Sequence, residues 1–194
     1  MNGEAAGFLP ALALMESAAA KGEPAIVAID GRCGSGKTSL ARLAKEKLRC
    51  AVAHTDDFYL PEAERINDWA RTPCANMDLA RLRREVLEPF RAGEPVLYRP
   101  YRCGDGTYGE AVTLPAGGLL LVEGSYAHHP GLADLYDGKV FLTCDSRTQR
   151  RRLGKREGSR LSVFEKVWIP LEERYIRQFS IGGDCLVIDT TEYF

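Results

Sequence analysis

The sequence predicts an α/β fold in three layers, with a parallel sheet of about five strands and helices on both of its faces. Nearly continuous apolar runs alternate with patterns of helical spacing, as in βαβ units joined by right-handed crossovers. Strands that are apolar at almost every position are typical of sheets covered on both faces. The expected strands are residues 25–29, 51–55, 118–122, 139–143 and 185–188, and the expected helices are residues 40–48, 78–91 and 162–179.

One segment breaks this alternation. Residues 95–102 and 110–114 have the pattern of two short strands, and the turn-prone sequence Gly104-Asp105-Gly106 lies between them. We therefore expect a β-hairpin inserted between the second and third strands of the sheet. Because ligands of open α/β sheets bind outside the carboxyl ends of the strands, residues at those ends are the first candidates for a functional site.

Residues 31–38 contain the phosphate-binding motif G-x-x-x-x-G-K-[ST], the P-loop, between the first expected strand and the first expected helix. Its glycines allow the backbone to curl so that successive N–H groups aim at phosphate oxygens next to a helix N-terminus. Lys37 is expected to bind the β- and γ-phosphates, and the Thr38 hydroxyl to ligate Mg²⁺. The sequence thus predicts a site for ATP and Mg²⁺ in a fold of the P-loop NTPase type. The residues predicted to bind the nucleotide are Gly31, Gly34, Ser35, Gly36, Lys37, Thr38 and Ser39.

Length and composition limit the other classes of function. A chain of 194 residues that is 45% hydrophobic can bury one core, so we expect a single domain over residues 1–194. The net charge of −1 gives no reason to expect nucleic acid or a membrane surface as a partner, and no apolar run is long enough to span a membrane. Residues 1–21 fit an amphipathic helix better than a secretory signal. The six cysteines lack C-x-x-C spacing and are expected to be reduced thiols in the cytoplasm, and a homo-oligomer is left open.

Carboxylates follow two of the expected strands directly. Asp56 and Asp57 come after the second strand and Glu123 after the third, at the edge of the sheet where the P-loop lies. A carboxylate there can accept the proton of an attacking hydroxyl or help to hold Mg²⁺. We expect Asp56 to be the catalytic base and Glu123 to hold the metal, whereas Asp57 is expected to cap the next helix.

Residues 147–160 form an arginine-rich stretch after the fourth expected strand. Most of it fits a solvated helix, and the nearly neutral net charge disfavours a nucleic-acid patch. In a phosphoryl-transfer enzyme, mobile arginines can cover the triphosphate and neutralise charge in the transition state. Arg156 and Arg160 flank the flexible residue Gly158 and are the predicted lid arginines, with Arg152 as a weaker third candidate.

These residues resemble the uridine kinase-like branch of the P-loop kinases, which also includes relatives of phosphoribulokinase and pantothenate kinase. The resemblance covers roughly residues 22–190. After the P-loop, the family's motifs follow in order as Asp56-Asp57-Phe58-Tyr59 (Asp-Ser-Phe-Tyr in uridine kinases), Tyr98-Arg99-Pro100-Tyr101, Val122-Glu123-Gly124 and Asp134-Leu135-Tyr136-Asp137. The resemblance implies that Asp56 is the catalytic base and Arg156 a lid arginine. It also implies an acceptor site in the insertion over residues 56–115, where Tyr59 and Tyr101 are the candidate substrate-binding residues.

Two departures from the family leave the acceptor open. Uridine kinases have His-Pro-Asp-Ala-Phe-Asp, whose first Asp holds the ribose hydroxyls, and here Cys74 stands in its place. The base-contacting histidine beyond the hairpin tyrosine is also missing, and the sequence there is Cys103-Gly104-Asp105-Gly106. We therefore predict a kinase that transfers the γ-phosphoryl group of ATP to a hydroxyl of a nucleoside-like or other small metabolite, with GTP as donor left open. The alternative is an ATPase that acts as a regulatory nucleotide switch, although the guanine-reading Asn-Lys-x-Asp motif of GTPases is absent.

Overall fold

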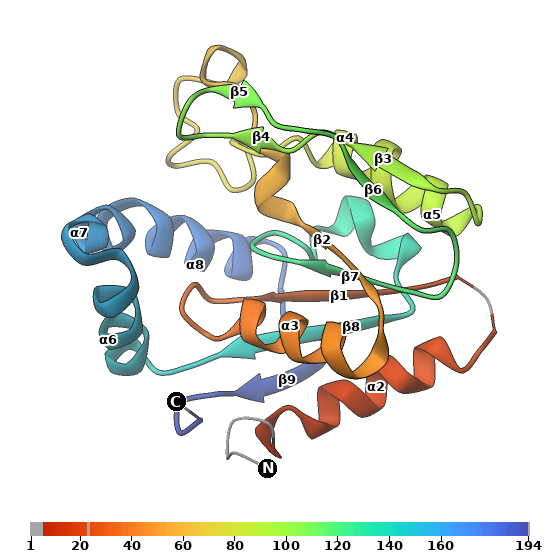
Figure 1. Cartoon of the computed structure of the whole chain (residues 1–194). Coiled ribbons are helices and arrows are strands. Elements are labelled where there is room, and N and C mark those ends of the chain that lie inside the picture. The colour runs from red at the N-terminus through yellow and green to blue at the C-terminus, as the bar shows by residue number, and fades with distance from the viewer. Residues whose placement is uncertain (1–5, 23, 194) are drawn as a thin grey trace.

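The central element is a sheet of five parallel strands. The computed structural model describes residues 6–22 and 24–193, and its strands lie in the order β2-β7-β1-β8-β9 (Figure 1). The strands are β1 Ala25–Gly31, β2 Ala51–His54, β7 Leu119–Glu123, β8 Gly138–Thr143 and β9 Leu186–Asp189. Each pair of neighbours is parallel. The five expected strands are therefore confirmed, at nearly the expected bounds.

The register of the sheet determines which residues meet at its carboxyl edge. Glu123 at the end of β7 lies opposite Ile29 of β1 on one side and His54 of β2 on the other. The P-loop leaves β1 just beyond this point, and Asp56 follows β2 at the same edge. Both β1 and β7 are buried at every position, as their continuous apolar sequences predict.

One face of the sheet is covered by the helices α2 (Leu9–Ala19) and α3 (Lys37–Leu48). Met15 of α2 and Leu40 of α3 are fully buried in one cluster with Val27 and Ile29 of β1. Helix α2 lies within the helix expected over residues 1–21, of which residues 1–5 lie outside the described residues. Helix α3 contains the expected helix and begins earlier, inside the P-loop motif.

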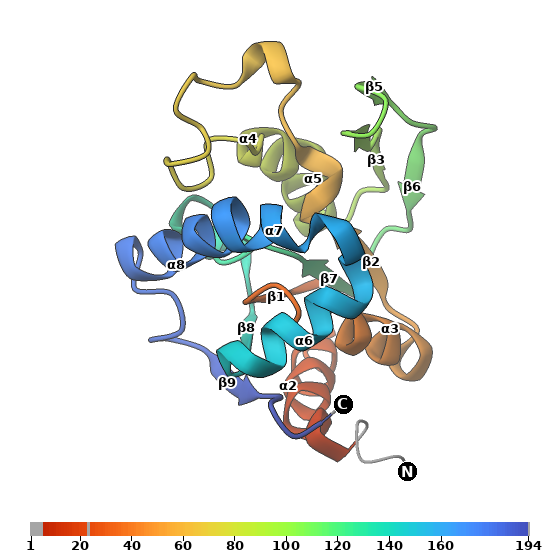
Figure 2. The ribbon, with the colours of Figure 1, turned by 90° about the vertical axis from the view of Figure 1, so that its left-hand side faces the viewer.

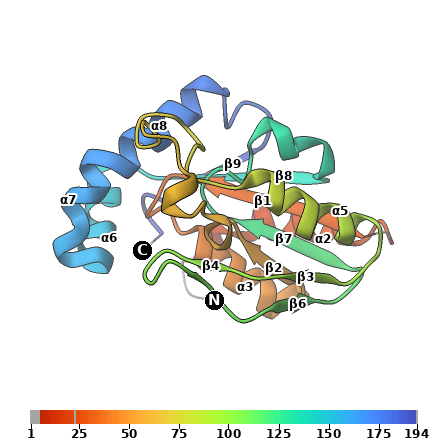
Figure 3. The ribbon, with the colours of Figure 1, turned by 90° about the horizontal axis from the view of Figure 1, so that it is seen from above.

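A second helical layer covers the opposite face (Figure 3). The expected helix over residues 78–91 consists of α4 (Leu79–Leu82), a π-helical turn η3 (Arg83–Leu87) and α5 (Glu88–Arg91). It begins after Asp78, whose carboxylate accepts a hydrogen bond of 2.9 Å from the N–H of Arg81. Leu82, Val86 and Phe90 are fully buried against this face of the sheet. Helices thus lie on both faces, and the predicted three-layer fold is confirmed.

The expected hairpin is present in two parts. Strand β3 (Val96–Tyr98) pairs with β6 (Val112–Leu114), and β4 (Tyr101–Arg102) pairs with β5 (Thr107–Tyr108), both in antiparallel register. Pro100 separates the two pairs because it has no N–H group to donate to a ladder. The returning strand therefore begins at Thr107 and not at residue 110, as the sequence had indicated.

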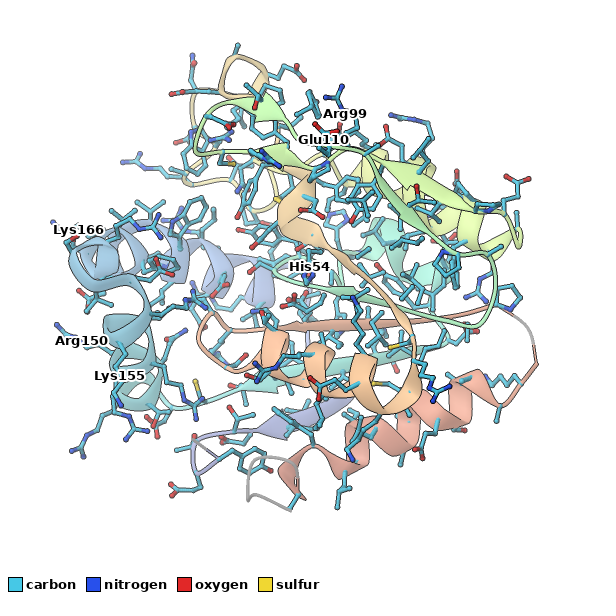
Figure 4. All side chains as sticks on the ribbon, viewed as in Figure 1. His54, Arg99, Glu110, Arg150, Lys155 and Lys166 are labelled. Carbon is cyan, nitrogen blue, oxygen red and sulfur yellow. The ribbon has the colours of Figure 1, made fainter. Side chains whose placement is uncertain are left out.

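Helices cross the carboxyl ends of the strands (Figure 2). They are α6 (Ser146–Glu157), α7 (Leu161–Val163) and α8 (Ile169–Gln178), joined by a 3₁₀ turn η5 (Gly158–Arg160) and a π-helical turn η6 (Phe164–Trp168). Short 3₁₀ segments elsewhere are η1 (Thr55–Phe58), η2 (Glu62–Glu64) and η4 (Pro130–Leu135). The arginine-rich stretch is mainly α6, and its Arg150 and Lys155 lie along the outer edge of the molecule with Lys166 (Figure 4).

Two further expectations concerned membrane-spanning helices and the state of the cysteines. Among the described residues, none of the helices combines the length and the apolar composition needed to cross a membrane. All six cysteines fall within the same residues, and each of them is a free thiol.

Candidate active site

The P-loop joins β1 to α3 and encloses the amine of Lys37. Gly34 and Gly36 have φ angles of 76° and 97°, which residues with a side chain rarely adopt. These two left-handed backbone conformations turn the loop back on itself. Lys37 is 9% exposed, and its Nζ donates hydrogen bonds to the carbonyl oxygens of Gly31 at 2.6 Å and Arg32 at 3.2 Å. The loop therefore curls around a buried positive charge, as the motif predicts.

The C-terminal part of the chain supports the loop from outside. Ser35 is fully buried, and its carbonyl oxygen accepts a hydrogen bond of 2.8 Å from the Thr190 hydroxyl. Arg152 of α6 donates to the carbonyl oxygens of Gly34 at 3.2 Å and Thr190 at 2.6 Å. The sequence left open whether Arg152 joins a lid, and in the structure its guanidinium holds the backbone of the phosphate loop.

Three polar side chains meet beside the loop at the carboxyl ends of β2 and β7. The Thr38 hydroxyl donates to Glu123 Oε1 at 3.1 Å, and His54 Nδ1 lies 2.8 Å from Glu123 Oε2. Burial by itself would raise the pKa of Glu123, but the His54 hydrogen bond and the Lys37 charge hold that pKa below its usual value. The pKa of His54 is raised, mainly by the same hydrogen bond. Glu123 is thus an ionised carboxylate beside a hydroxyl, and these are the oxygen ligands that Mg²⁺ prefers.

Asp56 lies in η1, directly after β2. It is exposed to water inside a cavity yet lies deep among protein atoms. This burial and the negative charge of Glu123 raise the pKa of Asp56, and the charges of Lys37 and His54 only partly oppose the shift. The raised pKa brings the carboxylate closer to the pH range in which a general base is most effective.

Asp57 does not cap a helix, so the expectation for it is wrong. The 3₁₀ turn begins at Thr55, which places Asp57 inside the turn and not at the capping position before it, and no described side chain caps this turn. The Asp57 carboxylate instead accepts a hydrogen bond of 2.9 Å from the Tyr98 hydroxyl. It therefore ties the segment after β2 to strand β3 of the hairpin.

Residues of the P-loop and Asp56 line one cavity of about 770 Å³. This volume is in the range of small-molecule and cofactor sites. The predicted site residues that line it are Gly34, Gly36, Lys37, Thr38, Ser39, Asp56, Tyr59, Glu123 and Arg156. Gly31 and Ser35 lie behind this lining. The structure thus places the phosphate loop and the predicted base around one shared space.

Besides Gly31 and Ser35, two more predicted residues do not line this cavity, Tyr101 and Arg160. Tyr101 is buried in the hairpin, where its ring centroid lies 5.4 Å from that of Tyr108. Cys103, in the turn after β4, lines the cavity instead. Arg160 forms an ion pair of 2.6 Å with Glu157, on the exposed side of η5.

Helix α8 contributes residues that the sequence did not single out. Glu172 is buried and accepts hydrogen bonds from the N–H of Cys33 at 2.9 Å and the Ser125 hydroxyl at 2.8 Å. The next residue, Glu173, forms an ion pair of 2.6 Å with Arg32. Two neighbouring carboxylates thus bind α8 to the P-loop. No local pattern indicates these contacts, because the partners are 139 and 141 residues apart.

Comparison with known proteins shows similarity of structure. No family model and no curated protein matches the chain. Its structure is similar to that of a possible uridine kinase from Bacillus stearothermophilus, with 18% identity, a TM-score of 0.64, and coverage of 93% of this chain and 100% of that chain. It is also similar to a candidate fructose transport system kinase from Silicibacter sp. TM1040 (20% identity, TM-score 0.67, coverage 91% and 97%). A third similar structure is D-glycerate 3-kinase from Cryptococcus neoformans (16%, 0.59, 84% and 86%). The chain has the P-loop kinase fold, as its resemblance to that group implied.

Proposed function

We propose that this protein is an ATP-dependent kinase that transfers the γ-phosphoryl group of ATP to a hydroxyl of a nucleoside-like or other small metabolite. The observation that carries the proposal is the shared cavity, because Lys37 and Asp56 both border it. The kinases of similar fold support a phosphotransferase with an alcohol acceptor. We also propose that residues 1–194 form one kinase domain.

In this proposal the P-loop holds the triphosphate. Lys37 moves its Nζ from the loop carbonyls to the β- and γ-phosphates, and the loop N–H groups donate to phosphate oxygens. Thr38 and Glu123 hold Mg²⁺, which neutralises phosphate charge when it is bound. Their oxygen atoms already lie 3.1 Å apart, so this pair of ligands needs little rearrangement.

Asp56 is the proposed base for the acceptor. Its carboxylate takes the proton of the acceptor hydroxyl as that oxygen bonds to the γ-phosphorus, and the bond to the β–γ bridging oxygen breaks to release ADP. Tyr59, which lines the cavity, is the proposed acceptor-site tyrosine, whereas Tyr101 is buried in the hairpin outside this lining. Arg156, which already lines the cavity, and Arg160 are proposed to close over the transferring group, with Gly158 between them as the flexing point.

A panel of metabolite alcohols tests the proposal. Each candidate is incubated with the protein, Mg²⁺ and [γ-³²P]ATP, and phosphorylated products are detected by radioactivity and identified by mass. We expect one class of alcohol to be phosphorylated, and Lys37→Met to abolish the product. Stoichiometric ATP loss without any phosphorylated product across the panel would instead favour the nucleotide-switch alternative. The same reactions with GTP compare the two donors.

A further inference from the structure

Part of the cavity wall is built from aromatic rings. Tyr59 and Trp168 line the cavity, and their ring centroids lie 6.4 Å apart. Trp69 packs behind them, with its ring centroid 5.5 Å from that of Trp168. These rings come from the segment after β2 and from η6, so the wall forms where the insertion meets the helices at the carboxyl ends. Flat apolar walls of this kind contact the body of a small ligand.

A guanidinium group lies beside these rings. Arg65 follows η2 and lines the same cavity. Its Nε donates to the carbonyl oxygen of Leu60 at 2.8 Å, and its carbon Cζ lies 5.4 Å from the centroid of the Trp69 ring. Within the part of the chain that the structure describes, Arg65 forms no ion pair with a carboxylate. A guanidinium has five N–H donors, so Arg65 keeps donors for a ligand.

Arg65 and Asp56, the proposed base, both interact with Cys103 in the cavity wall. The Nη2 atom of Arg65 lies 3.8 Å from the sulfur of Cys103, which also lines the cavity. Burial raises the pKa of Cys103, the charge of Arg65 lowers it, and the charge of Asp56 raises it. Cys103 is therefore close to Arg65 and within electrostatic range of Asp56, and all three residues line the same cavity.

The carboxylates that line the cavity besides Asp56 already have partners. Glu123 is bonded to Thr38 and His54, Glu172 to Cys33 and Ser125, and Glu157 to Arg156 and Arg160. The position of the ribose-binding Asp of uridine kinases is occupied by Cys74, which packs in a cluster of apolar side chains. Among the described residues that line the cavity, Arg65 is therefore a cation without a carboxylate partner, and Asp56, the proposed base, is the carboxylate that has no hydrogen-bond partner.

We propose that Arg65 binds an anionic group of the acceptor, a carboxylate or a phosphate, and that the preferred acceptors are anionic alcohols. Tyr59 and Trp168 contact the body of the acceptor between the anion and the reacting hydroxyl. This inference rests on the proposed kinase function for the identity of the reaction, but binding tests it separately. A bidentate pair of hydrogen bonds between the guanidinium and an anion selects strongly against a neutral analogue.

The two tryptophans of the chain make the test specific, because Trp69 and Trp168 both belong to this wall. Their fluorescence is titrated, in the presence of Mg²⁺ and a non-hydrolysable ATP analogue, with matched pairs of alcohols. The carboxylate pairs are glycerate against glycerol and pantothenate against pantothenyl alcohol, and the phosphate pair is ribose 5-phosphate against ribose. We expect the anionic member of one class to bind about 10- to 100-fold more tightly than its neutral partner, as for a hydrogen bond to a charged group.

Variants assign this preference to Arg65. Arg65→Gln should remove the preference for the anion, and Arg65→Lys should retain part of it because the charge remains. Arg71→Gln is the matched control: it removes the same charge from the same segment, but the Arg71 side chain is 76% exposed and does not line the cavity. Equal binding of the members of every pair, no binding of any anion, or a preference that survives Arg65→Gln would overturn the inference. An anion that binds with the expected preference but gives no phosphorylated product would overturn the kinase proposal alone.

Discussion

Replacing Asp56 with asparagine tests the proposed catalytic base. Asp56 makes no hydrogen bond to another described residue, and asparagine has nearly the same shape, so the change removes a charge and a proton acceptor without breaking a structural contact. General base catalysis contributes about 10²–10⁴-fold. This factor corresponds to about 2.7–5.4 kcal/mol of transition-state stabilisation. We expect kcat to fall by that factor, measured with the acceptor that the panel identifies.

The affinity for ATP should not fall with it. Asp56→Asn removes one negative charge near Lys37 and Glu123, where the γ-phosphate is proposed to bind, so ATP should bind equally well or more tightly. Displacement of a fluorescent ATP analogue measures this affinity. The neighbouring variant Asp57→Asn is the control, because Asp57 bonds to Tyr98 in the hairpin and does not line the cavity. Full turnover in Asp56→Asn, or an equal loss in Asp57→Asn, would refute the assignment of the base.

Two further predictions concern charge and backbone geometry. The ionised form of Asp56 is the active one, so kcat/KM should decline as the pH falls through its raised pKa. His54→Gln removes a positive charge that lowers this pKa and should move the acid limb of the pH profile to higher pH; a limb that stays in place would contradict the coupling. Gly31→Ala should lower the free energy of unfolding in urea by about 2–5 kcal/mol, because its Cβ would lie 2.0 Å from the Leu142 carbonyl oxygen at a φ of 143°. Gly93→Ala, with a φ of 75° and no atom of a described residue within 4 Å of the added Cβ, should cost only about 1–2 kcal/mol, and equal costs for the two variants would show that the close approach at Gly31 is relieved.

The layers of the fold could be predicted because burial leaves a local pattern. Strands β1 and β7 are buried at every position, and their sequences are apolar up to the carboxyl ends, where Asp30 and Glu123 lie. The helix beginning after Asp78 was likewise indicated by its spacing. The ends of the hairpin strands were less accurate, because pairing across the hairpin decides where each strand begins, and Pro100 divides that pairing in two.

Lys37, Thr38, Asp56 and Glu123 could be placed together from the sequence alone. Each lies at the carboxyl end of a parallel strand or in the loop and helix that follow it, and parallel register brings those ends to one edge of the sheet. Local order along the chain therefore determined the P-loop, the oxygens proposed to bind metal and the proposed base.

Only the tertiary structure decided what surrounds them. Glu172 reaches the P-loop from a helix 139 residues away, and Arg65, Cys103 and Trp168 form one wall from three separate segments. Contacts of this kind depend on how side chains pack between layers, and no periodicity in the sequence encodes which distant partner a side chain meets. The same packing buries Tyr101 within the hairpin and brings Arg65 to the cavity, so the part of the cavity that is proposed to select the acceptor depends on how the insertion packs against α8 and η6.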